Sequence, residues 1–403
     1  MPAGRQAFLR GKMPLFNKKG LREGRFKDNV ASGLIPDEER KRMTQKVSPE
    51  YIQTSLAASL TLGFQQGSFH RNAKLKGLNL LLHYEEGCLG RCHFCGLSRS
   101  RREGPKGKTF IRVDWPLYPL EEVIRRAKDK DQIHRVCISM ITHPRALKDT
   151  LHVIQRFKEE TDLSISVLIT PTLIHHEGAL KAMKKAGADR VGIAIDAATP
   201  ELFDHLRGRG VGGPHRWDHY WGLVRMAVEV FGKFRVGIHL IVGLGEREKE
   251  MVEAIQRGQD IGAHTHLFSF YPEKGSPMEG HPPPLIGEYR RIQLARWIIN
   301  EAFGSMDEMK FDEKGILVDF GIDIEPLIKM GDPFTTSGCP GRDGKVACNR
   351  PYGNERPSGP IRNFPFLPEP EDIEEIKAQL GITCPSSFRA CLSADKVGGS
   401  SRE

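Results

Sequence analysis

The sequence predicts an α/β protein built around a parallel sheet, as a partial or full TIM-type (β/α) barrel. From Leu78 onwards, short apolar runs alternate with stretches of helical period, which is the pattern of repeated β-α units. Six such units are visible, and a chain of 403 residues is long enough to bury one large core. An open six-unit barrel and a closed eight-unit barrel both fit this count.

The predicted elements follow one another in regular alternation. Strands are expected at Leu78–Tyr84, Arg135–Ile141, Ser164–Ile169, Arg190–Ile195, Arg235–Val242 and His266–Tyr271. Helices are expected at Leu120–Lys128, Leu147–Phe157, Gly178–Ala186, Trp221–Phe231, Lys249–Ile261 and Gly287–Ala302. Because parallel strands of a barrel end at one face, functional side chains are expected at their carboxyl ends.

The flanking regions differ from this core in composition. The segment before Ser48 is rich in Lys, Arg and Gly and poor in aliphatic residues, which is typical of a mobile basic arm. Ser48-Pro49-Glu50 looks like the cap of a helix that extends to Phe64. The expected organisation is a basic arm at 1–46, a helical extension at 47–76, the barrel core at 77–305, an irregular cysteine-containing region at 306–380 and a tail at 381–403.

Composition narrows the class of protein. Eight cysteines occur without a signal-peptide core or a membrane-length apolar run, so we expect a cytoplasmic protein whose clustered cysteines are metal ligands or catalytic thiols. The formal charge of +9 suits an anionic substrate, an acidic protein partner or a nucleic acid. A nucleic-acid role is disfavoured because no additional RNA-binding segment is visible.

Three cysteines follow the first predicted strand, in the stretch Cys88-Leu-Gly-Arg-Cys92-His-Phe-Cys95. Three thiolates on a four-iron cube leave one iron open, and that iron can chelate the amino and carboxylate groups of S-adenosylmethionine (SAM). Reductive cleavage then gives a 5'-deoxyadenosyl radical, with the protein supplying ligation and orientation. The alternative is a structural zinc site with His93 as its fourth ligand.

The three-cysteine loop, with Phe94 between its last two cysteines, resembles the signature of the radical SAM superfamily. The resemblance implies a 4Fe–4S cluster, SAM as cofactor and an adenine contact by Phe94. His239-Leu-Ile241-Val-Gly243-Leu-Gly245-Glu246 resembles the strand motif on the adenine side of the pocket, which assigns Ile241, Gly243 and Glu246 to cofactor binding.

The same resemblance assigns two further cofactor contacts. It places Asp196 at the ribose and Arg207 at the methionine carboxylate, which a bidentate guanidinium suits. An N-cap and a surface ion pair are the plainer alternatives for these two residues. One departure concerns Thr142-His143-Pro144, which stands where the family commonly has Gly-Gly-Glu, so the group that holds the methionine amine is not assigned.

Within the superfamily, the sequence looks closest to the biotin synthase and lipoyl synthase branch. Gly338-Cys339-Pro340 and the stretch that begins Cys348-Asn349-Arg350 resemble the C-terminal cysteine motif of two-component lipoyl synthases from archaea and anaerobic bacteria. The resemblance implies a second iron–sulfur cluster on Cys339 and Cys348, which a zinc clip could replace.

Other cysteines are weaker candidates for this second site. Cys137 matches a biotin synthase ligand position, although we favour an ordinary buried thiol there. Cys384 and Cys391 could complete a cluster from the terminal region. Arg350, Asn354 and Arg356 form a polar set that could bind a substrate carboxylate or carboxamide.

These resemblances imply sulfur insertion into an octanoyl chain carried on a lysine. The expected partners are an acidic lipoyl-carrier protein or domain, a second radical SAM subunit and an electron donor such as ferredoxin or flavodoxin, with no membrane. The alternatives are another radical SAM reaction, such as methylation, methylthiolation or rearrangement, and a noncatalytic iron–sulfur or zinc protein.

Overall fold

The computed structural model describes residues 46–102, 109–110, 113–351 and 359–381, all of which belong to one compact unit. Its centre is an eight-stranded sheet in the order β10-β9-β8-β7-β6-β2-β1-β5. The six strands from β2 to β10 in that order run parallel, as expected from the sequence. Their bounds are β2 Gly77–Leu81, β6 Arg135–Ser139, β7 Ser164–Ile169, β8 Arg190–Asp196, β9 Val236–Val242 and β10 His264–Ser269.

The sheet remains open within the described residues, because β10 and β5 are its two edge strands. This agrees with a partial rather than a closed barrel. The two faces of the sheet differ in burial. On β8, for example, Val191 and Ile193 are fully buried, whereas Gly192 and Asp196 are half-buried. We call the half-buried side, which also carries Cys137 and His239, the inner face.

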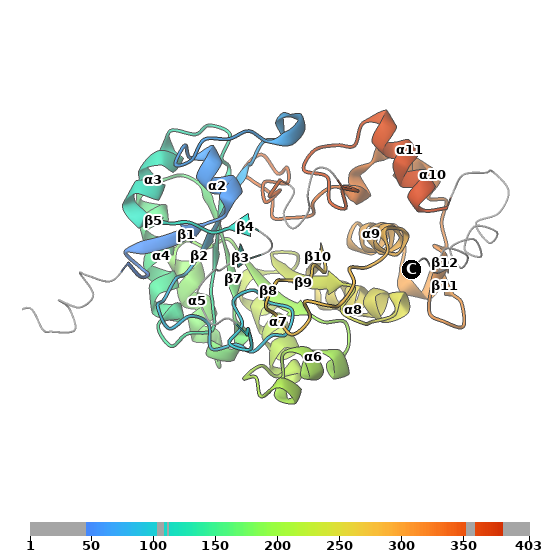
Figure 1. Cartoon of the computed structure of the whole chain (residues 1–403), viewed down its shortest axis with the longest axis horizontal. Coiled ribbons are helices and arrows are strands. Elements are labelled where there is room, and N and C mark those ends of the chain that lie inside the picture. The colour runs from blue at the N-terminus through green and yellow to red at the C-terminus, as the bar shows by residue number, and fades with distance from the viewer. Residues whose placement is uncertain (1–45, 103–108, 111–112, 352–358, 382–403) are drawn as a thin grey trace, which may run out of the picture. The chain divides into compact units, whose positions relative to one another are not determined.

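Helices alternate with the parallel strands, and Figure 1 shows them on the outside of the curved sheet. Their apolar stripes supply the other half of the core; Val153, Ile154 and Phe157 of α4, for example, are completely buried. The helices of the repeating units are α3 Leu120–Lys128, α4 Ala146–Glu160, α5 Glu177–Ala186, α6 Pro200–Leu206, α7 Trp217–Phe231, α8 Glu248–Ile261 and α9 Ile286–Asn300. All six predicted helices of this region are present, and α6 is an additional one.

The predicted helix from Ser48 to Phe64 is wrong in its first half. Tyr51–Thr54 is a strand, β1, and only Leu56–Thr61 is helical, as α2. Tyr51, Ile52 and Thr54 are aromatic or β-branched, and strand β1 pairs antiparallel with both β2 and β5, Leu117–Pro119. The true helix cap is Ser55, whose hydroxyl accepts the amide of Ala58 at 3.2 Å. The segment 47–76 therefore extends the sheet as well as adding a helix.

The C-terminal region is more regular than predicted. It contains a small hairpin of β11 Lys310–Phe311 and β12 Leu317–Asp319, together with helices α10 Glu325–Met330 and α11 Pro370–Gln379. Figure 1 shows α10 and α11 close to each other, and α11 also contacts α9. Arg71 fixes α11 to the N-terminal part of the domain through paired hydrogen bonds of 2.9 and 2.7 Å to Asp372.

A second short hairpin, β3 Thr109–Phe110 with β4 Val113–Asp114, stands apart from the main sheet. No helix among the described residues is long and apolar enough to cross a membrane.

Candidate active site

The three-cysteine loop begins shortly after β2, at the carboxyl end of the parallel strands. Its backbone is fixed to neighbouring units: the amide of Leu89 donates to the carbonyl of Thr142 at 2.7 Å, and that of His93 donates to the carbonyl of Leu206 at 2.8 Å. All three cysteines carry free thiols, with Cys92 buried and the other two half-buried. The loop is thus held by the segments that follow β6 and end α6.

Two backbone amides in this region also point toward the sulfur atoms of the loop. The amide of Gly90 lies 3.3 Å from Cys88 Sγ, and the amide of Leu97 lies 3.4 Å from Cys95 Sγ. Such N–H···S contacts stabilise thiolate sulfur and are a feature of iron–sulfur sites.

Gly90 lies where the loop backbone passes close to two of its own sulfurs. A Cβ atom at this position would lie 3.2 Å from Cys88 Sγ and 3.2 Å from the Nε2 atom of His215, with Cys92 Sγ at 3.9 Å. Two sulfurs and one imidazole nitrogen therefore surround a space that only glycine leaves open.

Burial disfavours the thiolate form of these cysteines unless a cation compensates for the negative charge. It raises the pKa of Cys92 to about 11, although the guanidinium of Arg207 opposes this shift. Burial likewise raises the pKa of Cys95 well above its usual range. Because thiolate is the form that binds metal, iron at this loop would supply the positive charge that the buried sulfurs require.

The donor set fits a four-iron cluster. Within the residues described, no three Cys, His, Asp or Glu side chains are arranged around a single metal position. Three thiolates on a cube each bind a different iron atom, so they need not meet at one point. Cys88, Cys92 and Cys95 would hold such a cluster and leave its fourth iron open.

Asp196 and Arg207 form a buried pair beside this loop. Asp196 ends β8 with a φ of 65°, at an irregularity in the pairing of β8 with β9. The Nη1 atom of Arg207 donates to Asp196 Oδ2 and, at 2.6 Å, to the carbonyl of Ala194. Only 5% of the surface of Arg207 is exposed, and its Nε atom has no hydrogen-bond partner among the residues that the structure describes. The plain alternative of a surface ion pair is therefore wrong for Arg207.

The predicted adenine side is built around Glu246. Its carboxylate accepts the amides of Gly243 at 2.7 Å and Leu244 at 2.9 Å, which closes the loop after β9. Gly243 has a φ of 97°, and a Cβ there would lie 2.6 Å from Pro284 Cδ, so glycine is required. Ile241 is half-buried on the inner face, and Phe94 is buried, with its ring centre 6.0 Å from the guanidinium carbon of Arg207. The cofactor contacts assigned to these residues stay predictions.

A second group of thiols lies on the inner face of the sheet. Cys137 of β6 hydrogen-bonds to Cys348. The sulfur of Cys348 also accepts a hydrogen bond from Asn79 Nδ2 at 3.7 Å. Cys339 and Cys348 are joined through the backbone, since the amide of Cys348 donates to the carbonyl of Cys339 at 3.1 Å. Cys137 therefore has thiol neighbours, which an ordinary core cysteine would lack.

Cys339 and Cys348 flank a turn that is closed by an isolated antiparallel bridge between Pro340 and Val346, and Arg135 anchors this turn to β6. This buried guanidinium makes two hydrogen bonds of 2.7 Å to Asp189, and its Nε atom donates to the carbonyl of Pro340 at 2.7 Å. Gly338 allows the close approach, because a Cβ there would lie 2.2 Å from the carbonyl oxygen of Cys348. The sequence neighbours of Cys339 thus place it against the barrel.

Hydrogen bonding changes the acidity of this second group. The hydrogen bond from Cys137 lowers the pKa of Cys348 to about 7, against the opposing effect of burial. The cation of Arg350 adds to this lowering, and its guanidinium lies 6.0 Å from the ring centre of Trp115. Asn354, Arg356, Cys384 and Cys391 lie outside the described residues.

Three residues of the site were missed by the sequence reasoning: Thr172, His215 and Tyr220. They form a largely buried hydrogen-bonded network next to the three-cysteine loop. His215 Nδ1 lies 2.7 Å from Thr172 Oγ1 and 2.8 Å from the hydroxyl of Tyr220. Burial lowers the pKa of His215 to about 2, and the cations of Arg207 and Arg216 add to the effect. A single histidine after Gly-Gly-Pro gives no motif, so only packing could have revealed it.

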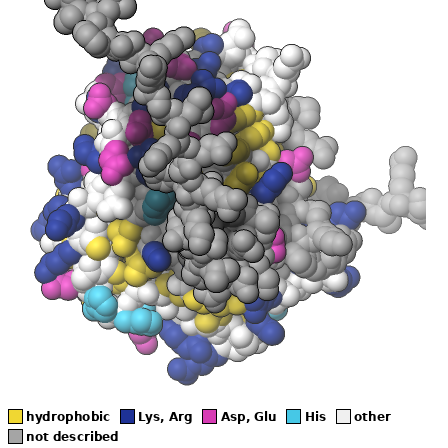
Figure 2. Space-filling model, turned by 90° about the vertical axis from the view of Figure 1, so that its left-hand side faces the viewer, with side chains coloured by type: hydrophobic (Ala, Val, Ile, Leu, Met, Phe, Trp, Pro, Cys, Tyr) yellow, Lys and Arg dark blue, Asp and Glu magenta, His cyan; other side chains and the backbone are white. Residues whose placement is uncertain are grey.

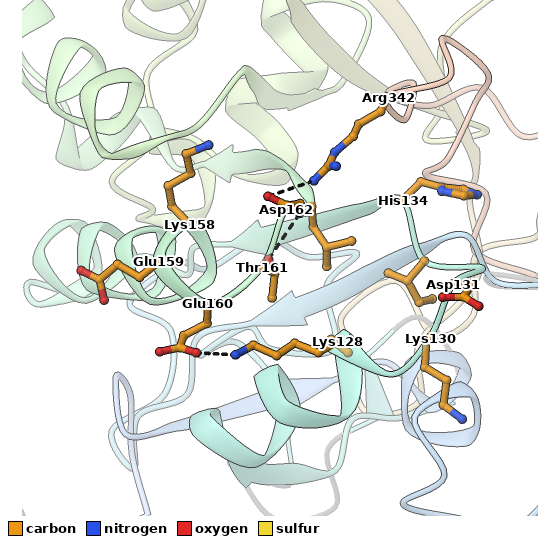
Figure 3. Close-up of a pocket in the computed structure, with 13 residues that line it drawn as sticks. Lys128, Lys130, Asp131, His134, Lys158, Glu159, Glu160, Thr161, Asp162 and Arg342 are labelled. Atoms are coloured by element: carbon orange, nitrogen blue, oxygen red, sulfur yellow. Dashed lines mark hydrogen bonds and ion pairs between the residues drawn. The ribbon is translucent and has the colours of Figure 1, made fainter. Parts of the chain in front are cut away.

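A large surface pocket lies away from this chemistry. Figure 3 shows it near the amino-terminal ends of β6 and β7, with Lys128 paired to Glu160 and Arg342 directed toward Asp162. It has a volume of about 500 Å³ and is lined by residues of both charges. Because it lies at the opposite ends of the strands from the three-cysteine loop, we assign it no part in the radical chemistry at that loop.

The fold and the donor set define a β/α protein with three free cysteines at the carboxyl ends of its strands, a donor set that fits an iron–sulfur cluster. Residues 84–258 match the radical SAM superfamily. The chain therefore contains a radical SAM domain, which includes all three loop cysteines and the β9 motif. No curated protein matches the chain.

Several solved structures match parts of this chain at low identity. Methylornithine synthase (PylB) is 18% identical, with a TM-score of 0.42 over 60% of this chain and 67% of its own. The FeFe-hydrogenase maturase HydG from Carboxydothermus hydrogenoformans is 16% identical, with a TM-score of 0.44 over 61% of this chain and 56% of its own. Coproporphyrinogen III oxidase (HemN) from Escherichia coli is 13% identical, with a TM-score of 0.34 over 52% and 49% of the two chains. These likenesses do not extend to a particular reaction.

Proposed function

We propose that this protein inserts sulfur at unactivated C–H positions of an octanoyl chain carried on a lysine, as lipoyl synthases do. The observation that carries the proposal is the meeting of Cys348 with Cys137 on the inner face of the same sheet that bears the radical SAM loop. Sulfur insertion needs a sulfur source within reach of the substrate radical, and a second cysteine group inside the barrel supports such a source.

When bound, the two cofactors would supply a 5'-deoxyadenosyl radical at the loop and a sulfide at the second site. The residues of the chain hold and orient them. Cys88, Cys92 and Cys95 would ligate the first cluster, and Cys339, Cys348 and Cys137 are the ligands proposed for the second. Arg350, whose cation acts on Cys348, would orient the second cluster or the substrate.

The basic charge supports an acidic carrier as partner. Figure 2 shows Lys and Arg side chains around the rim of one face, with Asp and Glu between them. Charge complementarity of this kind raises the rate of association more than it raises affinity. A second radical SAM subunit and a ferredoxin or flavodoxin as electron donor belong to the same proposal, as does a cytoplasmic location.

The first experiment measures iron and sulfide per chain after anaerobic reconstitution of a variant in which Cys88, Cys92 and Cys95 are Ala. We expect this variant to keep about four irons. Those irons should be lost when Cys339 and Cys348 are replaced as well. A variant with His175→Gln, at an exposed histidine, is the matched control and should keep the wild-type content. If the triple variant binds no iron, the second cluster is refuted.

The second experiment separates the proposed reaction from its rivals. The reconstituted protein is given SAM, dithionite and an octanoylated lysine peptide, and the products are analysed by mass spectrometry. Sulfur insertion predicts both 5'-deoxyadenosine and a peptide that has gained sulfur. Formation of 5'-deoxyadenosine without sulfur on the peptide would favour another radical SAM reaction, whereas the absence of both products would favour a noncatalytic protein.

A further inference from the structure

His215 lies in the loop between Arg209–Val211 and helix α7, and only 2% of its surface is exposed. Its Nε2 atom faces the three-cysteine loop, because the Cβ position of Gly90 is 3.2 Å from this nitrogen and 3.2 Å from Cys88 Sγ. The imidazole nitrogen therefore lies close to the sulfur of Cys88, one of the three thiols that would hold a cluster.

The opposite nitrogen of this ring is held by two hydroxyls. Thr172 Oγ1 lies 2.7 Å and the Tyr220 hydroxyl 2.8 Å from Nδ1. Arg207 Nη2 donates to the same Tyr220 oxygen at 3.3 Å. Since a guanidinium has only donors, Tyr220 accepts from Arg207 and has its own hydrogen available for Nδ1.

This chain of hydrogen bonds is compatible with the tautomer in which Nδ1 accepts from the Tyr220 hydroxyl. When Nδ1 of a neutral imidazole accepts a hydrogen bond, the proton of the ring is on Nε2. An imidazolium would also carry a proton on Nε2. With Nδ1 as the acceptor, the side of His215 that faces the cysteine loop is an N–H donor, as it also is in the imidazolium.

We propose that His215 is a positioning residue whose Nε2–H donates a hydrogen bond to a sulfur of the cluster held by Cys88, Cys92 and Cys95. The proposal rests on the cluster site of the proposed function and not on its sulfur chemistry. A hydrogen bond to cluster sulfur stabilises the more negative, reduced state, so it raises the reduction potential. Loss of the donor should make the cluster harder to reduce.

The test is a potentiometric titration, followed by EPR, of protein reconstituted without SAM. All variants carry Cys339→Ala and Cys348→Ala, so that only the first cluster titrates. His215→Leu removes the donor, whereas His215→Gln retains an N–H near the Nε2 position. His175→Gln is the control, since this histidine is exposed.

We expect His215→Leu to lower the equilibrium constant for one-electron reduction about tenfold, which corresponds to about 59 mV. His215→Gln should restore most of the shift, and the control should show none. An unchanged potential in His215→Leu with full iron content would overturn the proposal.

Tyr220→Phe is the second test variant, to be used if His215→Leu fails to fold or to bind iron. This variant removes one of the two hydroxyls at Nδ1 and should shift the potential in the same direction by a smaller amount. An unchanged potential in this variant with full iron content would count against the hydrogen-bond chain. Sulfur transfer is not measured here, so a failed octanoyl assay leaves this result unaffected, and a missing potential shift leaves the octanoyl assay unaffected.

Discussion

The guanidinium of Arg207 and the carboxylate of Asp196 form an ion pair at the carboxyl end of β8, with side-chain exposures of 6% and 13%. The pair joins the end of α6 to the last residue of the strand. It lies beside Cys92, whose pKa is affected by both charges. The structure thus connects two residues that the sequence assigned to separate parts of SAM.

Removing one partner of this pair should destabilise the domain strongly. We expect Arg207→Met to lower the free energy of unfolding by about 3–5 kcal/mol, because it leaves a buried carboxylate unpaired. The double variant Arg207→Met with Asp196→Asn should recover part of the loss, and Asn tolerates the positive φ of residue 196. Urea unfolding measures the free energy of unfolding of the single and the double variant. A double variant less stable than Arg207→Met alone would contradict the pairing.

The space at Gly90 should be needed for the cluster. Gly90→Ala would place a methyl group 3.2 Å from both Cys88 Sγ and His215 Nε2, so we expect reduced iron content after reconstitution while the fold is retained. Gly280→Ala is the matched control, because a Cβ there meets nothing within 4 Å. Iron analysis measures the iron content, and circular dichroism checks that the fold is retained. Equal iron in the two variants would show that the space is not required.

The interaction between Cys137 and Cys348 on the inner face should be detectable in iron-free protein. Because the pKa of Cys348 is lowered to about 7, its alkylation rate should rise with pH around that value. Cys137→Ala removes the hydrogen bond and should move the midpoint to higher pH. Mass spectrometry of the peptide that contains Cys348 distinguishes it from other thiols. A midpoint unaffected by Cys137→Ala would mean that the two thiols do not interact in solution.

The attachment of α11 should depend on pH. Burial alone would raise the pKa of Asp372, but its hydrogen bonds with Arg71 lower it below the usual value. A carboxyl with a lowered folded-state pKa stabilises the protein above the unfolded-state pKa, and this contribution is lost as pH falls through the folded-state value. Asp372→Asn should therefore be less stable than wild type at neutral pH, with the difference shrinking below about pH 4. Urea unfolding across this range checks the sign; a difference that grows as the pH falls would contradict it.

The repeating fold could be predicted because its signal is local. Parallel strands buried by helices require apolar runs such as Arg190–Ile195, and the helices between them require an apolar stripe. Strand β1 was missed because its assignment depends on pairing with β2 and β5, which are distant in the sequence. A strong local cap at Ser48 was outweighed by these ladder hydrogen bonds.

By itself, the sequence determined the alternating β/α core and the three-cysteine loop, since periodicity and ligand spacing are properties of neighbouring residues. Only the tertiary structure decided that Arg207 pairs with Asp196, that Cys348 meets Cys137 and that His215 faces the loop. These contacts join residues from different units of the sheet, and their geometry follows from the packing of the whole domain. Spacing along the chain carries no information about which distant side chains that packing brings together.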